Sequence, residues 1–528
     1  MPKITVKEFF GLIKLLRIDV FFFMSMFSSL LPNIALNQLI QDKYCMNHYS
    51  ANESVCLRLE SSASEYDSIQ IGVFKETTTL KMYITIITTI PTIFTSLIMG
   101  YWIDAYPNHL RYMLGFASAA NVVQNIMVIY QCIHFETDPY SLLYTYLFPI
   151  LTGSGAIIYT GTFTYATRKT PAKYRAIRFT VLEIFFFATM PTANTLGGHL
   201  IASDFWSFGL LRNYVGVYIF SSLGAVLATI WAFVMLNDSD QTVDQQTVEK
   251  LDVNLNNVED GGKEKEEKVG FKQIVADLLK PDNLILSCVR CVFKKRPNNG
   301  HWYIISTLMA GFIQNMTYLG EQNIVYQFNQ RVYHWDAKQI GYYGSLVMIF
   351  FTLGAIVGPP LFIYKMKLHD SAVAIIGIVS VTYCFLVKGL ILSPIVYVFM
   401  FFGSFAGVLL AIDRSILSRM VPTDEVGKLF AFNSAIGGII PILSSLYYTK
   451  VFQATIDYNP GLVYSLAAIM FIHPLGNAIV LTRNKEKWDL ALIAEKQKDN
   501  KQESELTNPL LVDPNANKEI ESSQKQQA

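Results

Sequence analysis

Charged residues are scarce in this chain. Only 16% of its 528 residues are Asp, Glu, Lys or Arg, whereas about 25% is usual for a soluble globular protein. The formal net charge is +1, so overall charge gives no reason to expect a nucleic-acid partner. The composition therefore argues against a soluble protein and against a nucleic-acid-binding one.

Catalytic signatures are also missing. The sequence contains no G-x-S-x-G, no H-E-x-x-H and no G-x-x-x-x-G-K-[ST] pattern, and its eight histidines are scattered singly. A lone C-x-x-C at Cys288 and Cys291 has no second pair to complete a metal site, so we interpret it as structural. We expect no enzymatic activity, no cofactor, no metal and no ATP-driven step.

Long apolar runs dominate what is present. Hydrophobic residues make up 52% of the chain, and the mean hydropathy is +0.32. A helix crosses ~30 Å of hydrocarbon in about 20 residues, and runs of this length favour helices over the ~10-residue alternating strands of membrane barrels. We predict an all-α membrane protein of about twelve transmembrane helices. The expected spans are 18–38, 81–102, 111–132, 141–165, 177–202, 213–235, 302–322, 339–363, 371–390, 393–417, 429–451 and 461–482.

Basic residues in the short loops indicate the orientation. Lys14, Arg111, Arg168, Lys365 and Arg483 all flank spans on the side that holds both termini. Because cytoplasmic loops carry the excess of Lys and Arg, we predict a multi-pass protein with both termini in the cytoplasm. The lipid bilayer is its expected surrounding.

The first outside loop, residues 39–80, carries two features of an extracytoplasmic segment. Asn52-Glu53-Ser54 is a glycosylation acceptor. Cys45 and Cys56 share the same loop, where the environment permits a disulfide. A bond between them and two unpaired thiols are the alternatives.

A polar segment divides the spans six and six. Residues 237–269 are rich in Asp, Glu, Lys, Asn and Gln, and such a segment cannot bury enough apolar surface to offset its ordering entropy. Apolar residues at helical spacing in 271–279 then predict a short amphipathic helix. The expected organisation is a first six-helix half (1–235), a cytoplasmic linker (236–300), a second six-helix half (301–482) and a disordered cytoplasmic tail (483–528).

The two halves share a faint repeat. Arg168, Pro171 and Phe179 recur as Arg419, Pro422 and Phe430 at one constant offset. Parallel repeats of six helices joined at the midpoint describe the major facilitator fold, which we therefore predict.

Few charges lie inside the predicted spans, where they usually face a cavity or each other. Glu183 lies in the fifth span and Arg414 in the tenth. A partly desolvated carboxylate can exchange protons near neutral pH, and an arginine can hold a substrate carboxylate through two hydrogen bonds. For both residues a structural ion pair is the alternative. Glu321 and Asp413 are interpreted as structural or interfacial charges.

The second span ends in Gly100-Tyr-Trp-Ile-Asp104, with His109 and Arg111 beyond it. An aspartate at a helix end that faces basic residues can act as a gate. An ordinary interfacial turn is the alternative.

Three longer runs carry a resemblance to a known family. They are Arg414–Phe432 with Val451–Thr455, Arg175–Glu183 with Leu196–His199, and Val292–Pro297. In these runs the chain resembles the major facilitator subfamily that includes the proton-coupled folate transporter and the thymic stromal cotransporter, solute carrier family 46. The resemblance covers nearly the whole membrane region and is weakest in the linker and the tail.

The resemblance implies roles for individual residues. Glu183 matches the family's proton-coupling glutamate, and Arg414 matches an arginine linked to substrate and proton handling. Asp104 matches the aspartate after the second span, which implies a share in proton coupling and in a gate. The expected gate residues are Asp104, Arg111, Arg175 and Arg178.

The chain departs from the family in three places. Pro107-Asn108-His109 stands where the family commonly has Gly-Arg-Arg, and Thr167-Arg168 stands where an acidic residue is common. The outside loop at 323–337 has no cysteine to pair with the first outside loop. Any bridge of that loop must therefore join Cys45 to Cys56.

Taken together, these observations predict proton-coupled symport of a small organic anion such as folate, with the anion and protons as partners. The plasma membrane is the expected location. The first alternative is a lysosomal exporter of muropeptides or other amphipathic solutes, since Glu505–Leu511 is close to an acidic dileucine signal. The second is a membrane receptor or scaffold that binds a ligand without transporting it.

Overall fold

The computed structural model describes residues 16–60, 67–170, 175–204, 208, 210–236, 284–422, 425–490 and 492–493. These residues form helices and connecting turns, with no strand among them. Ten of the described helical segments are long and apolar enough to cross a membrane. Two more, α5 (Asp67–Ala105, 39 residues) and α14 (Gly300–Tyr333, 34 residues), lie among them in the bundle. Each of the twelve corresponds to one predicted span.

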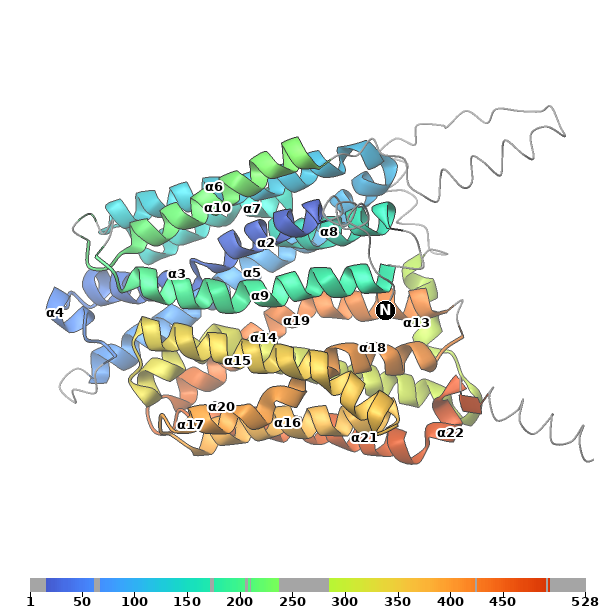
Figure 1. Ribbon diagram of the computed structural model, residues 1–528. Coiled ribbons are helices and arrows are strands. Elements are labelled where there is room, and N and C mark those ends of the chain that lie inside the picture. The colour runs from blue at the N-terminus through green and yellow to red at the C-terminus, as the bar shows by residue number, and fades with distance from the viewer. Residues whose placement is uncertain are drawn as a thin grey trace, which may run out of the picture.

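The first half of the chain forms one group of helices, coloured blue to green in Figure 1. Besides α5, its elements are α2 (Arg17–Leu30), α3 (Asn33–Lys43), the π-helical turn η1 (Tyr44–His48), α4 (Glu53–Cys56), η3 (Pro107–His109), α6 (Leu110–Ile133), η4 (Pro139–Tyr146), α7 (Leu147–Thr152), α8 (Ser154–Lys169), α9 (Arg175–Ile201) and α10 (Tyr214–Met235).

The second half forms the other group, coloured yellow-green to red (Figure 1). Besides α14, its elements are α13 (Leu284–Phe293), η6 (Pro297–Asn299), α15 (Ala337–Pro359), η7 (Pro360–Lys365), α16 (Asp370–Leu390), α17 (Val396–Phe399), η8 (Met400–Val408), α18 (Leu409–Arg419), α19 (Val426–Thr455), α20 (Leu462–Met470), α21 (Ile472–Arg483) and α22 (Lys485–Trp488).

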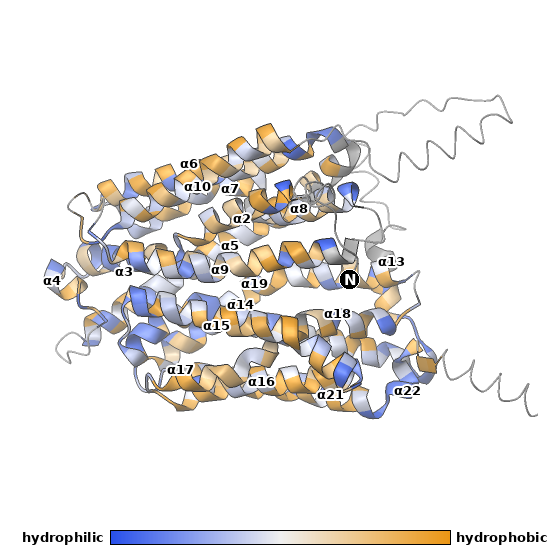
Figure 2. Cartoon of the chain, viewed as in Figure 1, coloured by the Kyte–Doolittle hydropathy of each residue, from blue (hydrophilic) through white to orange (hydrophobic). Residues whose placement is uncertain are grey.

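The two ends of the bundle differ. One end carries α4 and is called the disulfide end; the other carries α13 and α22 and is called the linker end (Figure 1). Apolar residues cover the helix surfaces between them, while hydrophilic residues collect toward both ends (Figure 2). Large apolar side chains such as Phe94, Phe116 and Val234 are more than half exposed on these surfaces. That distribution fits a bundle whose outer face contacts lipid.

Helix boundaries differ from the predicted spans where polar residues extend a helix. α5 begins at Asp67 and α14 continues to Tyr333, so both run beyond the apolar stretches that predicted them. The fourth span breaks between α7 and α8 at Gly153, whose φ of 66° is left-handed. Glycine adopts this conformation without the steric cost that a Cβ brings.

The linker prediction falls mostly outside the described residues. Positions 237–283, which include the amphipathic helix expected at 271–279, and the tail beyond 493 are not described. The described end of the linker is α13, which packs against the start of α19.

Candidate functional site

The two halves meet closely at the disulfide end, where α9 packs along α15. A Cβ on Gly198 would lie 2.9 Å from the carbonyl oxygen of Ala337, and one on Gly341 would lie 2.6 Å from that of Asn194. Real Cβ atoms do not approach backbone atoms this closely. The helices can therefore be in contact only because both positions are glycine.

Side-chain hydrogen bonds join the halves at the same end. Gln41 Nε2 donates to Gln330 Oε1 at 2.7 Å. Gln38 Oε1 accepts from the Tyr326 hydroxyl at 2.7 Å and from Gln330 Nε2 at 3.2 Å. These four side chains are at most 3% exposed. Because these bonded side chains are buried, the two halves are in direct contact at this end of the bundle.

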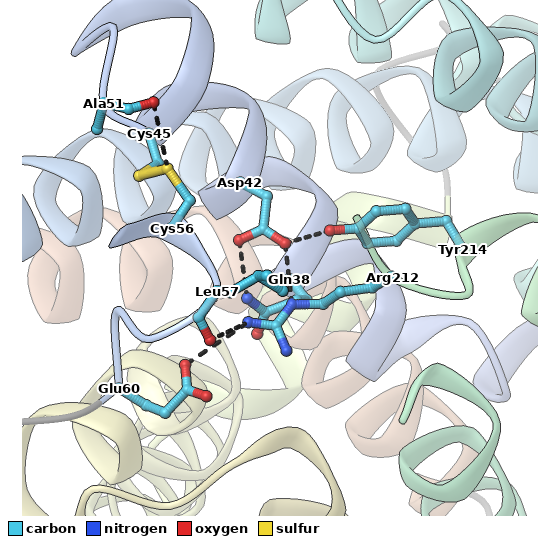
Figure 3. The surroundings of a disulfide bond; sticks show 9 residues. All are labelled: Gln38, Asp42, Cys45, Ala51, Cys56, Leu57, Glu60, Arg212 and Tyr214. Carbon is cyan, nitrogen blue, oxygen red and sulfur yellow. Dashed lines mark hydrogen bonds and ion pairs between the residues drawn. A yellow bond between two sulfur atoms is a disulfide. The ribbon is translucent and has the colours of Figure 1, made fainter. Parts of the chain in front are cut away.

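Asp42 anchors this network in the first half (Figure 3). Its carboxylate is fully buried and accepts hydrogen bonds from Gln38 Nε2 at 2.9 Å, from Arg212 Nε at 3.1 Å and from the Tyr214 hydroxyl. Arg212 also donates to the Leu57 carbonyl oxygen at 3.1 Å. The arginine thus ties the loop after α4 to the end of the bundle.

The disulfide lies beside this cluster (Figure 3). Cys45, at the end of the first span, is bonded to Cys56 at the end of α4. Asn52 precedes the first residue of α4, makes no side-chain capping hydrogen bond and is exposed. The acceptor asparagine is therefore open to solvent at the disulfide end.

Toward the linker end, Glu183 of α9 and Arg414 of α18 face each other across the boundary between the halves. Glu183 Oε1 lies 3.8 Å from Arg414 Nη1, and the two side chains are 42% and 66% exposed. Both predicted residues are thus brought together from opposite halves. The distance is a charge contact rather than a hydrogen bond, and solvent reaches both groups.

A cavity of about 1240 Å³, counting the part open to solvent, is lined mostly by the second half and is bordered on one side by the first half. Its walls include Asn37 and Asn194 of the first half and Tyr326 and Phe351 of the second. Glu183 precedes Asn194 by eleven residues on α9, about 16 Å along a helix. The exposed pair therefore lies nearer the linker end than the part of the cavity that Asn194 lines.

A second ion pair borders this cavity and lies wholly in the second half. Lys388 Nζ of α16 donates to Glu321 Oε1 of α14, and the side chains are 7% and 12% exposed. Lys388 Nζ also lies 5.4 Å and 5.2 Å from the ring centres of Tyr343 and Tyr464. Glu321 was expected to be a structural charge, and sequence reasoning misses Lys388. Its place within the apolar run 371–390 is the signal that could have identified it.

The predicted gate residues do not form one group among the described side chains. Arg178 is buried and donates to Asp19 of α2, Nη1 to Oδ1 at 2.6 Å. Arg111 stacks on Tyr112 with 4.6 Å between its guanidinium carbon and the ring centre. The side chains of Asp104 and Arg175 lie outside the described set. Asp413 forms no ion pair with the described residues.

A charge cluster at the linker end holds α13 in place. Glu425, at the start of α19, accepts hydrogen bonds from Lys294 Nζ at 2.9 Å and from Arg296 Nη2 at 2.5 Å. The hydrogen bond from Lys294, together with Arg296, lowers the pKa of Glu425 below its usual value. Burial and the neighbouring Glu425 carboxylate raise the pKa of the Cys291 thiol. The two C-x-x-C cysteines, Cys288 and Cys291, form no disulfide and are both buried.

Comparisons with known sequences point to one superfamily. A family model described as "Major Facilitator Superfamily" matches residues 16–445. "Probable peptidoglycan muropeptide transporter SLC46" of Drosophila melanogaster is 28% identical over 174 residues, 32% of each chain. The Mus musculus "Lysosomal proton-coupled steroid conjugate and bile acid symporter SLC46A3" is 28% identical over 149 residues, 26% of this chain and 30% of the relative. The aligned regions thus span about a third of the length of these curated relatives.

Solved structures share the fold at low identity. A POT family transporter in complex with a thioalcohol-conjugated peptide has a TM-score of 0.56 at 11% identity, covering 88% of this chain and 96% of that one. A D-xylose–proton symporter has a TM-score of 0.54 at 11% identity, covering 88% and 97%. These likenesses show the fold and extend over both halves.

Proposed function

The chain belongs to the Major Facilitator Superfamily, in which its relatives are members of solute carrier family 46, and from this premise we propose that it is a proton-coupled symporter of an amphipathic organic anion. The protein is a multi-pass membrane transporter of the predicted family and fold.

The observation that carries the proposal is the contact between Glu183 and Arg414. The two residues come from opposite halves, so rearrangement of the halves changes their separation. Protonation of Glu183 would release Arg414 to hold an anionic group of the substrate. An anion in the site would in turn favour protonation of Glu183, because a second negative charge near the carboxylate disfavours its ionised form.

The cavity supports an amphipathic substrate rather than a uniformly polar one. Val347, Met348, Phe351 and Phe385 supply apolar walls, while Asn194 supplies a hydrogen-bonding amide. Muropeptides, steroid conjugates and bile acids are the solutes named for the relatives. Folate, implied by the resemblance, combines an aromatic body with carboxylates and remains in the proposal.

The disulfide end is proposed to face away from the cytoplasm. Disulfides persist in oxidising compartments, and the exposed Asn52 acceptor lies at the same end. The linker and both termini would then lie in the cytoplasm, as positively charged loops predict. In this orientation the protein is closed toward the extracytoplasmic side. The plasma membrane remains the predicted location. The endolysosomal membrane is the alternative, because one relative is named as a lysosomal symporter.

The test is uptake of labelled folate, a muropeptide and glycocholate into cells that express the full chain at the surface, at pH 5.5 and pH 7.4. We expect uptake of at least one of them at pH 5.5 that disappears when a protonophore collapses the gradient. If a solute is taken up at a rate that depends neither on pH nor on the protonophore, proton coupling is refuted. Binding without uptake at either pH would favour the receptor alternative. Imaging of the tagged protein distinguishes the two membranes.

A further inference from the structure

The Glu321–Lys388 pair differs from the Glu183–Arg414 pair in one decisive respect, its burial. Glu321 and Lys388 are 12% and 7% exposed, whereas Glu183 and Arg414 are 42% and 66% exposed. An exposed charge that loses its partner is compensated by water, at a cost of about 0–1 kcal/mol. A buried charge that loses its partner is not compensated, and the cost is about 3–5 kcal/mol. The buried pair can therefore separate only if something replaces the lost charge.

The two carboxylate oxygens of Glu321 differ in their described partners. Oε1 accepts from Lys388 Nζ, and the Tyr464 hydroxyl donates to it at 3.4 Å. Among the described residues, none donates a hydrogen bond to Oε2. Both Glu321 and Lys388 line the cavity between the halves. A molecule in the cavity can therefore reach both charged groups.

We propose that Glu321 and Lys388 form an anion-exchange subsite, in which an anionic group of the transported molecule takes the place of Glu321 on Lys388 while Glu321 takes up one proton. The bond that breaks is the Lys388 Nζ–Glu321 Oε1 ion pair, and the bond that forms joins Lys388 Nζ to the substrate anion. The proton is taken up from the bulk solution by way of water in the cavity and stays on the Glu321 carboxyl group. The substrate anion and the proton enter together, so the net charge of the buried site does not change. This inference rests on the proposed function, which supplies the anion and the proton.

Among the residues that the structure describes, no other cation is placed to compensate Glu321. The described titratable groups around it are Lys388, Cys384, Tyr318, Tyr333, Tyr343, Tyr448 and Tyr464. Tyrosine and cysteine side chains are neutral near pH 7. Lys81 of α5 is directed to the Gln322 carbonyl oxygen and to Gln327. Once an anion occupies Lys388, protonation is the remaining way to avoid an unpaired buried carboxylate.

Apolar residues near the pair define the rest of the ligand. Val381 and Phe385 of α16 and Val325 of α14 line the same cavity. The subsite thus takes the carboxylate, sulfate or sulfonate end of a molecule whose body is apolar. Lys388 is fixed between two tyrosine rings, which orient its ammonium group for this contact.

The experiment measures the rise in melting temperature that folate, a muropeptide or glycocholate gives to the full-length protein in detergent at pH 5.5 and 7.5. One proton taken up per anion bound makes affinity rise by up to about tenfold for each unit by which the pH falls. We expect a larger stabilisation of the wild type at pH 5.5. Glu321→Gln, which mimics the protonated carboxyl, should bind equally well at both pH values, and Lys388→Gln should not bind.

Two further variants keep the test decisive. Glu321→Gln/Lys388→Gln removes both charges, so it should fold even if a single variant does not, and it should lose binding. Glu136→Gln, at a side chain that is 80% exposed and does not line the cavity, should keep the pH-dependent stabilisation. The inference is overturned if Lys388→Gln binds as the wild type does, or if Glu321→Gln keeps the pH dependence of the wild type. No stabilisation of the wild type by any of the three probes would instead remove the proposed substrate class, and the subsite with it.

Discussion

Glu183 on α9 and Arg414 on α18 lie 3.8 Å apart, Oε1 to Nη1, although they belong to opposite halves and are separated by 231 positions. Both remain open to solvent. The contact therefore adds little to stability, because exposed ion pairs contribute about 0–1 kcal/mol. The contact matters because the distance between Glu183 and Arg414 depends on the relative position of the two halves.

The first prediction follows from this exposure. Glu183→Gln should decrease acid-stimulated uptake at pH 5.5 by about tenfold or more, because the proton-binding group at the contact between the two halves is gone. The free energy of unfolding should change by less than about 1 kcal/mol. Glu136→Gln, an equally conservative change at a side chain that is 80% exposed, is the control. Unchanged acid-stimulated uptake in Glu183→Gln would exclude the coupling role.

The close contact of α9 with α15 gives a second prediction. Gly341→Ala should force the helices apart at the disulfide end, because its Cβ would lie 2.6 Å from the Asn194 carbonyl oxygen. We expect faster labelling of a cysteine introduced at Gln330 by a membrane-impermeant maleimide applied from that end. Gly311→Ala is the matched control, since no atom lies within 4 Å of its Cβ position. Equal labelling rates in both variants would contradict the predicted separation of α9 from α15.

Arg178 and Asp19 form a buried pair inside the first half, with side chains 8% and 0% exposed. Arg178→Ala should lower the free energy of unfolding by about 3–5 kcal/mol, because it leaves the Asp19 carboxylate buried and unpaired. Asp19→Leu/Arg178→Met should recover most of that loss, since neither charge then remains. Thermal unfolding in detergent measures both. A gate role would instead alter transport while leaving the melting temperature of Arg178→Ala near that of the wild type.

The contacts of Glu425 predict how α13 is held. Its lowered pKa means that its contribution to stability is complete above the ordinary value of 4.5 and is lost as the pH falls through the lowered value. At neutral pH Glu425→Gln should therefore free α13, and Cys291, buried beside it, should react faster with maleimide. Asp457→Asn, at the disulfide end of the bundle, is the control. If Cys291 reacts at the wild-type rate, the cluster does not anchor the helix.

The loop at the disulfide end supplies a prediction of orientation. Asn52→Gln should increase electrophoretic mobility to that of the enzymatically deglycosylated wild type, because the sequon is exposed. Cys45→Ser should lower the free energy of unfolding by about 3 kcal/mol, as expected when a short loop is no longer closed. Asn47→Gln, in the same loop but outside a sequon, controls for the amide change. A wild-type chain that carries no glycan in a secretory-pathway host would count against the proposed orientation.

The sequence by itself determined the number and approximate positions of the spans, the family, and the candidacy of Glu183 and Arg414. These depend on local properties: an apolar run must be long enough to cross a bilayer, and a charge within it is rare enough to be informative. The span boundaries predicted from the sequence were less accurate for α5 and α14. Each of these helices continues into polar residues, which hydropathy does not assign to a membrane span.

Only the tertiary structure decided which charges are partners. Lys388 meets Glu321, Arg178 meets Asp19, and Arg212 meets Asp42 because their helices pack side by side, and nothing in the local sequence specifies that packing. Burial was likewise set by the fold, and it is burial that separates the exposed Glu183 from the buried Glu321. The cost of leaving a charge unpaired depends on its access to water, so that chemical difference arises only in the folded protein.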